Sequence, residues 1–192
     1  MSEDLLFYAQ LGHADHIRRL IADGTDPDWR REDGVTTLMM AAITGRVDVM
    51  NALLDSGATV DLPAPDGLTA LLAACAYART TREIAGIERL LRRGASPRRA
   101  NAAGNDPLML CARHGIEDAV RVLIAAGADP LAKNRHCTTA LMQAARGHFV
   151  VPVTALIAAG ASKTEVDEGG LTALRYAFES GAPSEDLRAL LR

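Results

Sequence analysis

A pattern that repeats every 33 residues constrains this chain more than any other feature of its sequence. A leucine followed at the third position by a small residue recurs at Leu38, Leu71, Leu108, Leu141 and Leu174, at intervals of 33, 37, 33 and 33 residues. The same intervals separate Gly24, Gly57, Gly94, Gly127 and Gly160, and Leu5 stands 33 residues before Leu38. A fixed period of this length indicates stacked repeats that share their core with neighbours, rather than one monolithic core.

Within each period the residues favour two short helices joined by a tight turn. Glycine stands seven residues after the marker leucine at Gly12, Gly45, Gly115 and Gly181. A helix that ends here needs a residue with positive φ, which glycine adopts without a Cβ clash. His148 occupies this place in the fifth repeat, so we expect that turn to be shifted or strained.

The first helix of each repeat begins at a residue suited to capping. Thr36 precedes the second repeat's first helix, and its hydroxyl can accept a hydrogen bond from a free backbone N–H. Asp106 can do the same in the fourth repeat, where Pro107 fits the first helical position because no N–H is needed there.

The phrase Thr-x-Leu-x-x-Ala-Ala, then Gly, a Leu-Leu pair and Gly-Ala-Asp, resembles the ankyrin repeat over nearly the whole chain. The resemblance implies an all-α repeat solenoid of stacked helix-turn-helix units with β-turn fingers. One departure is uniform: the family's usual His after the marker leucine is replaced by Met39, Leu72, Met109, Met142 and Arg175. The hydrogen bonds of that histidine must then be made by other groups or be lost.

The period predicts a single ankyrin-repeat domain over residues 2–192, with repeats at about 2–30, 31–63, 64–100, 101–133, 134–166 and 167–192. The terminal repeats are expected to act as caps. The third repeat holds four extra residues between Tyr77 and Gly86. They are either a tolerated insertion or a modified rim beside the binding groove, carrying Tyr77, Arg79, Thr80, Thr81 and Arg82.

Charge is unevenly distributed along the chain, although the net charge of −3 is too small to imply an acidic or basic partner. Residues 1–66 carry 5 basic and 12 acidic side chains, whereas residues 67–135 carry 11 basic and 6 acidic ones. An array with an acidic end and a basic middle has a directional electric field.

The three cysteines favour a reducing compartment. Cys75, Cys111 and Cys137 form no CxxC pair, and the first two stand at small-residue positions, which favours buried apolar roles. The start of the sequence is acidic and shows no signal peptide, and no run of 18 apolar residues could span a membrane. We therefore expect a cytoplasmic protein.

The sequence predicts no catalytic, cofactor-binding or metal-binding site. Its 5 histidines show no HExxH spacing and no cluster with Cys or Asp at metal-ligand spacing, and no phosphate-binding loop is present. Catalysis needs groups that converge in a pocket, which an open repeat groove lacks. The chain is therefore interpreted as a non-enzyme without cofactors.

The resemblance implies that a partner binds the concave face made by the fingers and the exposed side of each first helix. The candidate contact residues are Trp29, Arg31, Glu32, Asp33, Asp66, Tyr77, Arg98, Arg99, Asn101, Arg113, His114, Asn134, Arg135, His136 and Arg146. Trp29 either contacts a partner or packs beneath the first finger. Met40, Leu110 and Gln143 stand at the position that the family tends to expose.

The function this predicts is a non-catalytic protein–protein interaction module: an adaptor, scaffold, inhibitor or regulatory subunit, monomeric by itself. The alternative is binding of nucleic acid or another anion through the arginine-rich middle, where Arg92-Arg93 and Arg98-Arg99 cluster. No aromatic residues interleave these arginines, and the whole chain is acidic. Regulation of a defined enzyme remains a third possibility for the same surface.

Overall fold

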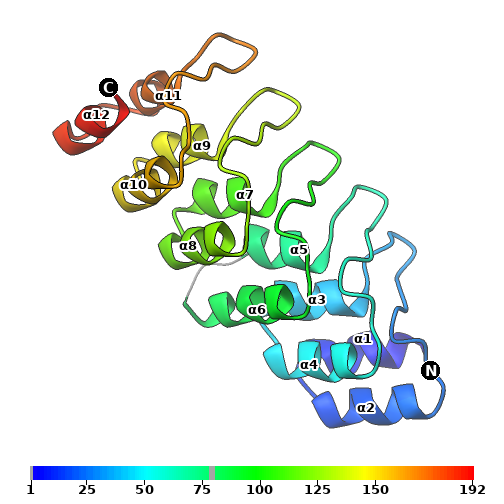
Figure 1. Cartoon of the computed structure of the whole chain (residues 1–192). Coiled ribbons are helices and arrows are strands. Elements are labelled where there is room, and N and C mark those ends of the chain that lie inside the picture. The colour runs from blue at the N-terminus through cyan, green and yellow to red at the C-terminus, as the bar shows by residue number, and fades with distance from the viewer. Residues whose placement is uncertain (1, 78–80) are drawn as a thin grey trace. The chain divides into compact units, whose positions relative to one another are not determined.

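The regular structure of this protein is helical throughout the part that is described. The computed structural model describes residues 2–77 and 81–192, and the side chains of residues 4–77 and 84–192. These ranges form no strand and contain the helices α1 (Ser2–Leu11), α2 (Ala14–Ala22), α3 (Thr37–Ile43), α4 (Val47–Asp55), α5 (Ala70–Tyr77), α6 (Thr81–Arg92), α7 (Pro107–His114), α8 (Glu117–Ala125), α9 (Ala140–Arg146), α10 (Val150–Ala158), α11 (Ala173–Glu179) and α12 (Glu185–Leu191) (Figure 1). The all-α helix-turn-helix class predicted from the sequence is confirmed.

Contacts divide the helices into two compact units, residues 1–96 (unit 1) and 97–192 (unit 2). In unit 1 the first helices α1, α3 and α5 pack in a row, and the second helices α2, α4 and α6 pack behind them. Unit 2 has the same plan, with α7, α9 and α11 in one row and α8, α10 and α12 in the other (Figure 1). The single domain expected over residues 2–192 stays a prediction.

The first helices begin where the sequence predicts. The Thr36 hydroxyl accepts from the Met39 N–H at 3.2 Å, and the Asp106 carboxylate accepts from the Met109 N–H at 2.7 Å, with Pro107 in the first turn. The sulfur of Met39 also accepts from the Thr36 N–H at 3.5 Å. A methionine sulfur therefore takes up one of the hydrogen bonds that the missing histidine left open.

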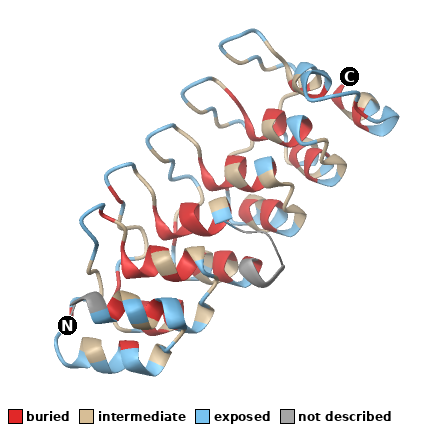
Figure 2. Cartoon of the chain, turned by 180° about the vertical axis from the view of Figure 1, so that it is seen from behind, coloured by how far each residue is buried: buried red, intermediate tan, exposed pale blue. Residues whose placement is uncertain are grey.

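The cores lie between the two rows of helices (Figure 2) and consist mainly of alanine, leucine and methionine, with some isoleucine and valine. The marker leucines Leu5, Leu38, Leu71, Leu108 and Leu141 are buried, as are Cys75 and Cys111 at the small-residue positions. Leu174, in the last helix pair, is only half-buried. Small residues allow the helices to approach closely, so the cores can be dense although aromatics make up only 4% of the sequence.

Three of the four predicted turn glycines show the left-handed conformation, and the fourth, Gly181, has a positive φ of 143°. Gly12, Gly45 and Gly115 have φ of 83°, 64° and 69°. His148 keeps the same conformation without being glycine, with φ 58°, so the predicted strain at this turn is present. Cys137, at a finger tip, is also left-handed, with φ 57°.

The four extra residues of the third repeat accompany a longer second helix. Helix α6 has 12 residues, whereas α4, α8 and α10 each have nine. Adding about one helical turn leaves the apolar face pointing nearly as before, and Ile87 and Leu90 remain fully buried. The rim residues Arg79 and Thr80, and the side chains of Thr81 and Arg82, lie outside the described part.

The loops between helix pairs form hydrogen-bonded fingers, which extend from one side within each unit (Figure 1). In unit 2 each finger also bonds to the next through backbone atoms, since the Arg135 N–H donates to the Ala103 carbonyl at 3.1 Å and the Glu168 N–H to the His136 carbonyl at 3.2 Å. Gly104 lies at such a contact, where an added Cβ would stand 2.8 Å from the Arg135 nitrogen.

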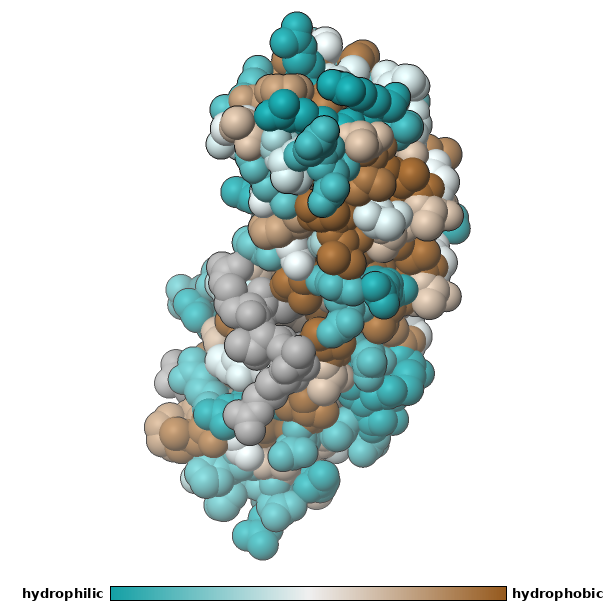
Figure 3. Space-filling model, turned by 90° about the vertical axis from the view of Figure 1, so that its left-hand side faces the viewer, coloured by the Kyte–Doolittle hydropathy of each residue, from teal (hydrophilic) through white to brown (hydrophobic). Residues whose placement is uncertain are grey.

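In unit 2, the large apolar side chains that are exposed in the described part of the chain come from separate segments. Leu131, Val151, Val166 and Phe178 are 52%, 42%, 43% and 46% exposed and belong to four different segments. On the face shown in Figure 3, hydrophobic residues gather along the middle and hydrophilic residues lie beside them. The Arg188 guanidinium covers the Phe178 ring, 5.4 Å from its centroid. Among the described helices, none combines the length and apolar character needed to span a bilayer.

Candidate functional site

Unit 2 contains an open groove of about 460 Å³ on the side of its first helices and fingers. We call it the inner groove. It is lined by Asn105, Arg113, Asn134, His136, Thr138, Gln143, Arg146, Asp167, Glu168, Gly169 and Tyr176. These residues come from α7, α9, α11 and the fingers that precede them, so three successive helix pairs contribute to one surface.

Four predicted contact residues meet in this groove. Arg113 lies in the last turn of α7 and Arg146 ends α9, 33 residues apart, so the period places both guanidinium groups at corresponding points of neighbouring helices. Asn134 and His136 come from the finger between them. His114 lies next to Arg113 but is half-buried and does not line the groove.

The floor of the groove is held by asparagine and aspartate side chains. The Asn134 amide oxygen accepts from the His136 and Thr138 N–H groups at 3.0 and 2.9 Å, and its nitrogen donates to the Asn105 amide oxygen at 2.8 Å. Asp167 accepts from the Gly169 and Leu171 N–H groups at 2.9 and 2.8 Å. These side chains fix the finger turns from which the groove residues project.

Tyr176 completes the far end of the groove. Its hydroxyl donates to the Asp167 carboxylate at 2.7 Å and lies 3.5 Å from the Thr138 hydroxyl. Burial raises the pKa of Tyr176 above its ordinary value. The hydrogen bond from Tyr176 holds the pKa of Asp167 below its usual value, and the Leu171 N–H acts in the same direction. His136 Nδ1 lies 3.2 Å from the Glu168 carboxylate.

Tyr176 is not among the contact residues predicted from the sequence, although its position in the repeat indicates an exposed side chain. It stands two residues after Leu174, as Met40, Leu110 and Gln143 stand after their own marker leucines. That position was expected to be exposed, and an aromatic residue with a polar hydroxyl suits a half-exposed binding surface. Its hydrogen-bond partner Asp167 lies nine residues earlier in the sequence, and the two side chains meet only once the finger has folded.

The other candidates lie outside the inner groove, in several separate segments. On the first finger, Trp29 is half-buried and lines an open cavity of about 490 Å³ with Arg30, Arg31, Glu32 and Asp33. Arg31 pairs with Asp33 at 3.1 Å. Trp29 is thus partly packed and partly accessible.

Asp66, Asn101 and Tyr77 lie outside the inner groove. The Asp66 carboxylate accepts from the Leu68 N–H at 2.9 Å, and the Asn101 amide oxygen accepts from the Ala103 and Asn105 N–H groups at 3.0 Å each, so both side chains hold their own finger turns. Tyr77 ends α5 with its side chain 53% exposed.

The arginines of the middle region are largely engaged with protein groups. Arg92 pairs with Glu88 at 3.5 Å, and Arg93 pairs with Asp55. The Arg98 Nε donates to the Gly127 carbonyl at 2.7 Å, at the end of α8, where a positive charge suits the helix dipole. Arg99 and Arg135 are exposed.

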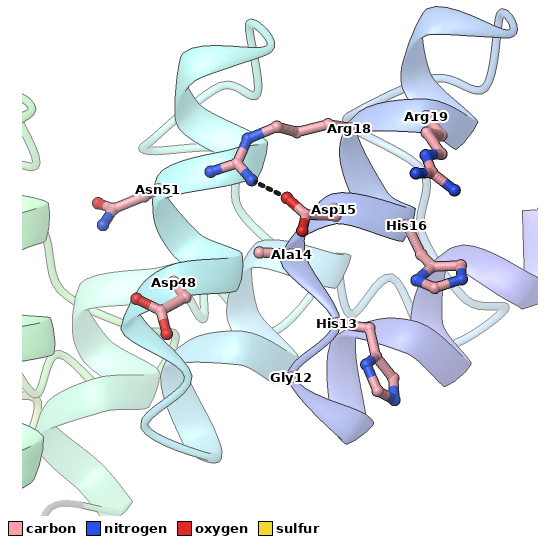
Figure 4. A pocket seen from close by; sticks show the side chains of 9 residues that line it. All are labelled: Gly12, His13, Ala14, Asp15, His16, Arg18, Arg19, Asp48 and Asn51. Carbon is pink, nitrogen blue, oxygen red and sulfur yellow. Dashed lines mark hydrogen bonds and ion pairs between the residues drawn. The ribbon is translucent and has the colours of Figure 1, made fainter.

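A second cavity, of about 510 Å³, lies against α2 and α4 in unit 1 (Figure 4). Its lining includes His13, Asp15, His16 and Asp48, and Arg18 pairs with Asp15 at 2.7 Å. Figure 4 shows both histidines on the side away from Asp48, and Tyr8 stacks on His16 with centroids 4.5 Å apart. Across the described residues, no group of three or more His, Cys, Asp or Glu side chains could hold a metal ion.

Comparison with known proteins agrees with this architecture. A family model described as ankyrin repeats in three copies matches residues 5–101 and 57–134. The search of curated proteins gave no match. Among solved structures, the chain is similar to an ankyrin repeat domain from Acinetobacter baumannii AYE, with 27% identity, a TM-score of 0.87, and 100% of this chain and 97% of the other covered. The chain belongs to the ankyrin repeat family.

Proposed function

We propose that this protein binds a protein partner through the inner groove and has no catalytic activity of its own. Ankyrin repeats are generally protein–protein interaction modules. The observation that carries the proposal is the groove itself, in which three successive helix pairs present hydrogen-bonding side chains on one open surface. On this interpretation the protein is a monomeric cytoplasmic adaptor, scaffold, inhibitor or regulatory subunit.

The first finger supplies a second proposed contact. Trp29 is the single tryptophan of the chain, and it is half-buried beside the ion pair of Arg31 and Asp33. Partly exposed tryptophan and arginine side chains are the usual energetic anchors of interfaces. The nucleic-acid alternative is less well supported, because Arg92, Arg93 and Arg98 already bind protein groups.

The test is to fill the groove without changing its charge. Gln143 lines the groove and is half-exposed, so Gln143→Trp should block a partner sterically. Ala158→Trp, at the exposed end of α10, adds the same side chain outside the groove and serves as the control. Affinity capture from the cells that make the protein should recover a defined partner with the wild type and with Ala158→Trp, but not with Gln143→Trp. Equal recovery with both variants would count against the proposed site.

A further inference from the structure

Two positively charged side chains of the inner groove are available to a ligand. Arg113 and Arg146 are both exposed, and within the described residues neither guanidinium forms an ion pair. By contrast, Arg121 on the neighbouring second helix α8 pairs with Glu117 one turn away. The groove thus contains two planar cationic groups whose donors suit carboxylates.

The acidic side chains of the same groove are already engaged. Asp167 accepts the Tyr176 hydroxyl and two backbone N–H groups, and Glu168 faces His136. These carboxylates therefore bond to groups of the fold itself rather than to the arginines, although they keep their negative charge. What the groove offers to a partner is two guanidinium groups whose hydrogen-bond donors have no carboxylate partner among the described residues.

The spacing of the two arginines suggests the form of the ligand. Helices α7 and α9 pack directly against each other, and packed helices lie about 8–10 Å apart. A polyproline II segment has three residues per turn and rises about 3.1 Å per residue, so residues three apart share one face about 9 Å apart. Two acidic side chains at that spacing match the separation expected of Arg113 and Arg146.

We propose that the inner groove recognises an extended acidic peptide segment with two carboxylate side chains three residues apart, one bound by Arg113 and the other by Arg146. Gln143 lies on α9 one turn before Arg146 and lines the same groove, where its amide can bond to the peptide backbone. This inference rests on the proposed function and specifies the chemistry of the partner.

The experiment measures binding of a labelled peptide containing Glu-Pro-Pro-Glu, which favours polyproline II. The wild type should bind it more tightly than a Gln-Pro-Pro-Gln peptide or one with adjacent glutamates, and binding should weaken as salt is raised. Arg113→Gln or Arg146→Gln should each weaken binding about fivefold to tenfold, whereas Arg121→Gln should not. Thermal unfolding of each variant checks that it is folded.

A charge exchange gives an independent measurement. The double variant Arg113→Glu/Arg146→Glu should lose the glutamate peptide and gain binding to a Lys-Pro-Pro-Lys peptide. The proposal is overturned if the glutamate peptide binds no better than its glutamine counterpart, or if the arginine substitutions leave its affinity unchanged. Preference for a mixed-sequence oligonucleotide over the peptide would also overturn it. If Gln143→Trp still abolishes partner capture in those cases, the acidic ligand is wrong while the protein-binding groove stands.

Discussion

Among the described residues, two other than glycine adopt the left-handed conformation, and one of them makes hydrogen bonds that offset the strain. His148, with φ 58°, places its ring Nε2 2.8 Å from the Ala177 carbonyl and 2.9 Å from the Ser180 hydroxyl, which ties its turn to α11. Cys137, with φ 57°, occupies the finger position that Gly104 and Gly170 hold in neighbouring repeats. Its side chain makes no hydrogen bond with the described residues.

Substitution by glycine should therefore change the free energy of unfolding in opposite directions at the two sites. Cys137→Gly relieves backbone strain of about 1–2 kcal/mol and adds about 0.5–1 kcal/mol of chain entropy, so it should raise the free energy of unfolding by roughly 0.5–1 kcal/mol. His148→Gly relieves similar strain but removes hydrogen bonds to α11, so it should lower stability by about 1 kcal/mol. Denaturant unfolding measures both, and equal signs for the two variants would refute this explanation.

Asp106 is a titratable group at a site where other repeats use threonine. The residue is 4% exposed, and burial raises the pKa of its carboxyl to about 6, although the Met109 and Leu108 N–H groups act in the opposite direction. The folded state therefore binds this proton more tightly than the unfolded state does. The protonated Asp106 carboxyl therefore contributes its full stabilisation of the folded state below about pH 4. This contribution is lost as the pH rises through about 6.

Asp106→Thr should remove this pH dependence while keeping a capping oxygen. A shift from 3.8 to about 6 corresponds to about 3 kcal/mol of folding free energy between acidic and neutral pH. The difference in unfolding free energy between wild type and variant should thus change in favour of the variant from pH 4 to pH 7. Groups common to both proteins cancel in this difference, so a constant value across the range would show that Asp106 titrates normally.

At the residue scale, the sequence predicted those features that depend on residues close to one another in the chain. Thr36, Asp106 and the strained turn at His148 were identified because a cap or a turn is decided within a few residues. The polar contacts of the groove were not, because Tyr176 meets Asp167 and His136 meets Glu168 only after the fingers fold. Periodicity places columns of side chains, but it does not determine which polar groups within them pair.

At the scale of single elements, helix starts in this chain use sulfur as an acceptor. The Thr139 N–H donates to the Met142 sulfur at 3.4 Å, as Thr36 does to Met39. Met109 holds the same position in α7, yet among the described contacts its sulfur accepts no bond from Asp106. The family's histidine is thus replaced at two helix starts by a weaker acceptor, which sequence comparison alone could not reveal.

Substituting Met142 and Met109 in parallel separates the effect of the hydrogen bond to sulfur from the effect of packing. Met142→Leu and Met109→Leu both conserve volume at buried positions, 1% and 2% exposed, but only the first leaves a buried N–H without its acceptor. Met142→Leu should cost about 1 kcal/mol more than Met109→Leu in denaturant unfolding. Equal costs would mean that the sulfur contributes nothing to the helix start.

Helix α6 shows how an insertion can be absorbed within an element. The sequence placed four extra residues between Tyr77 and Gly86, but it left open whether they extend a loop or modify the rim. In the structure the second helix is longer, and its buried residues Ile87 and Leu90 keep their register. Loop extension and helix extension both lengthen this interval from 33 to 37 residues, so the spacing of the apolar residues could not distinguish them.

At the scale of the whole molecule, each of the two units has its own core. In unit 1 Leu53 is fully buried on α4, and in unit 2 Leu156 is fully buried on α10. In repeat proteins stability is approximately a sum of local terms and contacts between nearest neighbours. Damage to one core should therefore weaken that unit most.

Hydrogen exchange tests this expectation directly. Leu53→Ala should cost roughly 2–5 kcal/mol locally and reduce amide protection in α1–α6 far more than in α7–α12. Leu156→Ala is the reciprocal control and should give the opposite distribution. Uniform loss of protection over the whole chain in both variants would instead indicate one cooperative unfolding unit.

The fingers of unit 2 are joined through main-chain atoms, by the Arg135 N–H to the Ala103 carbonyl and the Glu168 N–H to the His136 carbonyl. Side chains at these tips take no part in those two links. Evolution, or a protein engineer, can therefore exchange the side chains of Arg135 and Glu168 to change what the loops bind, while the main-chain links between the fingers are preserved.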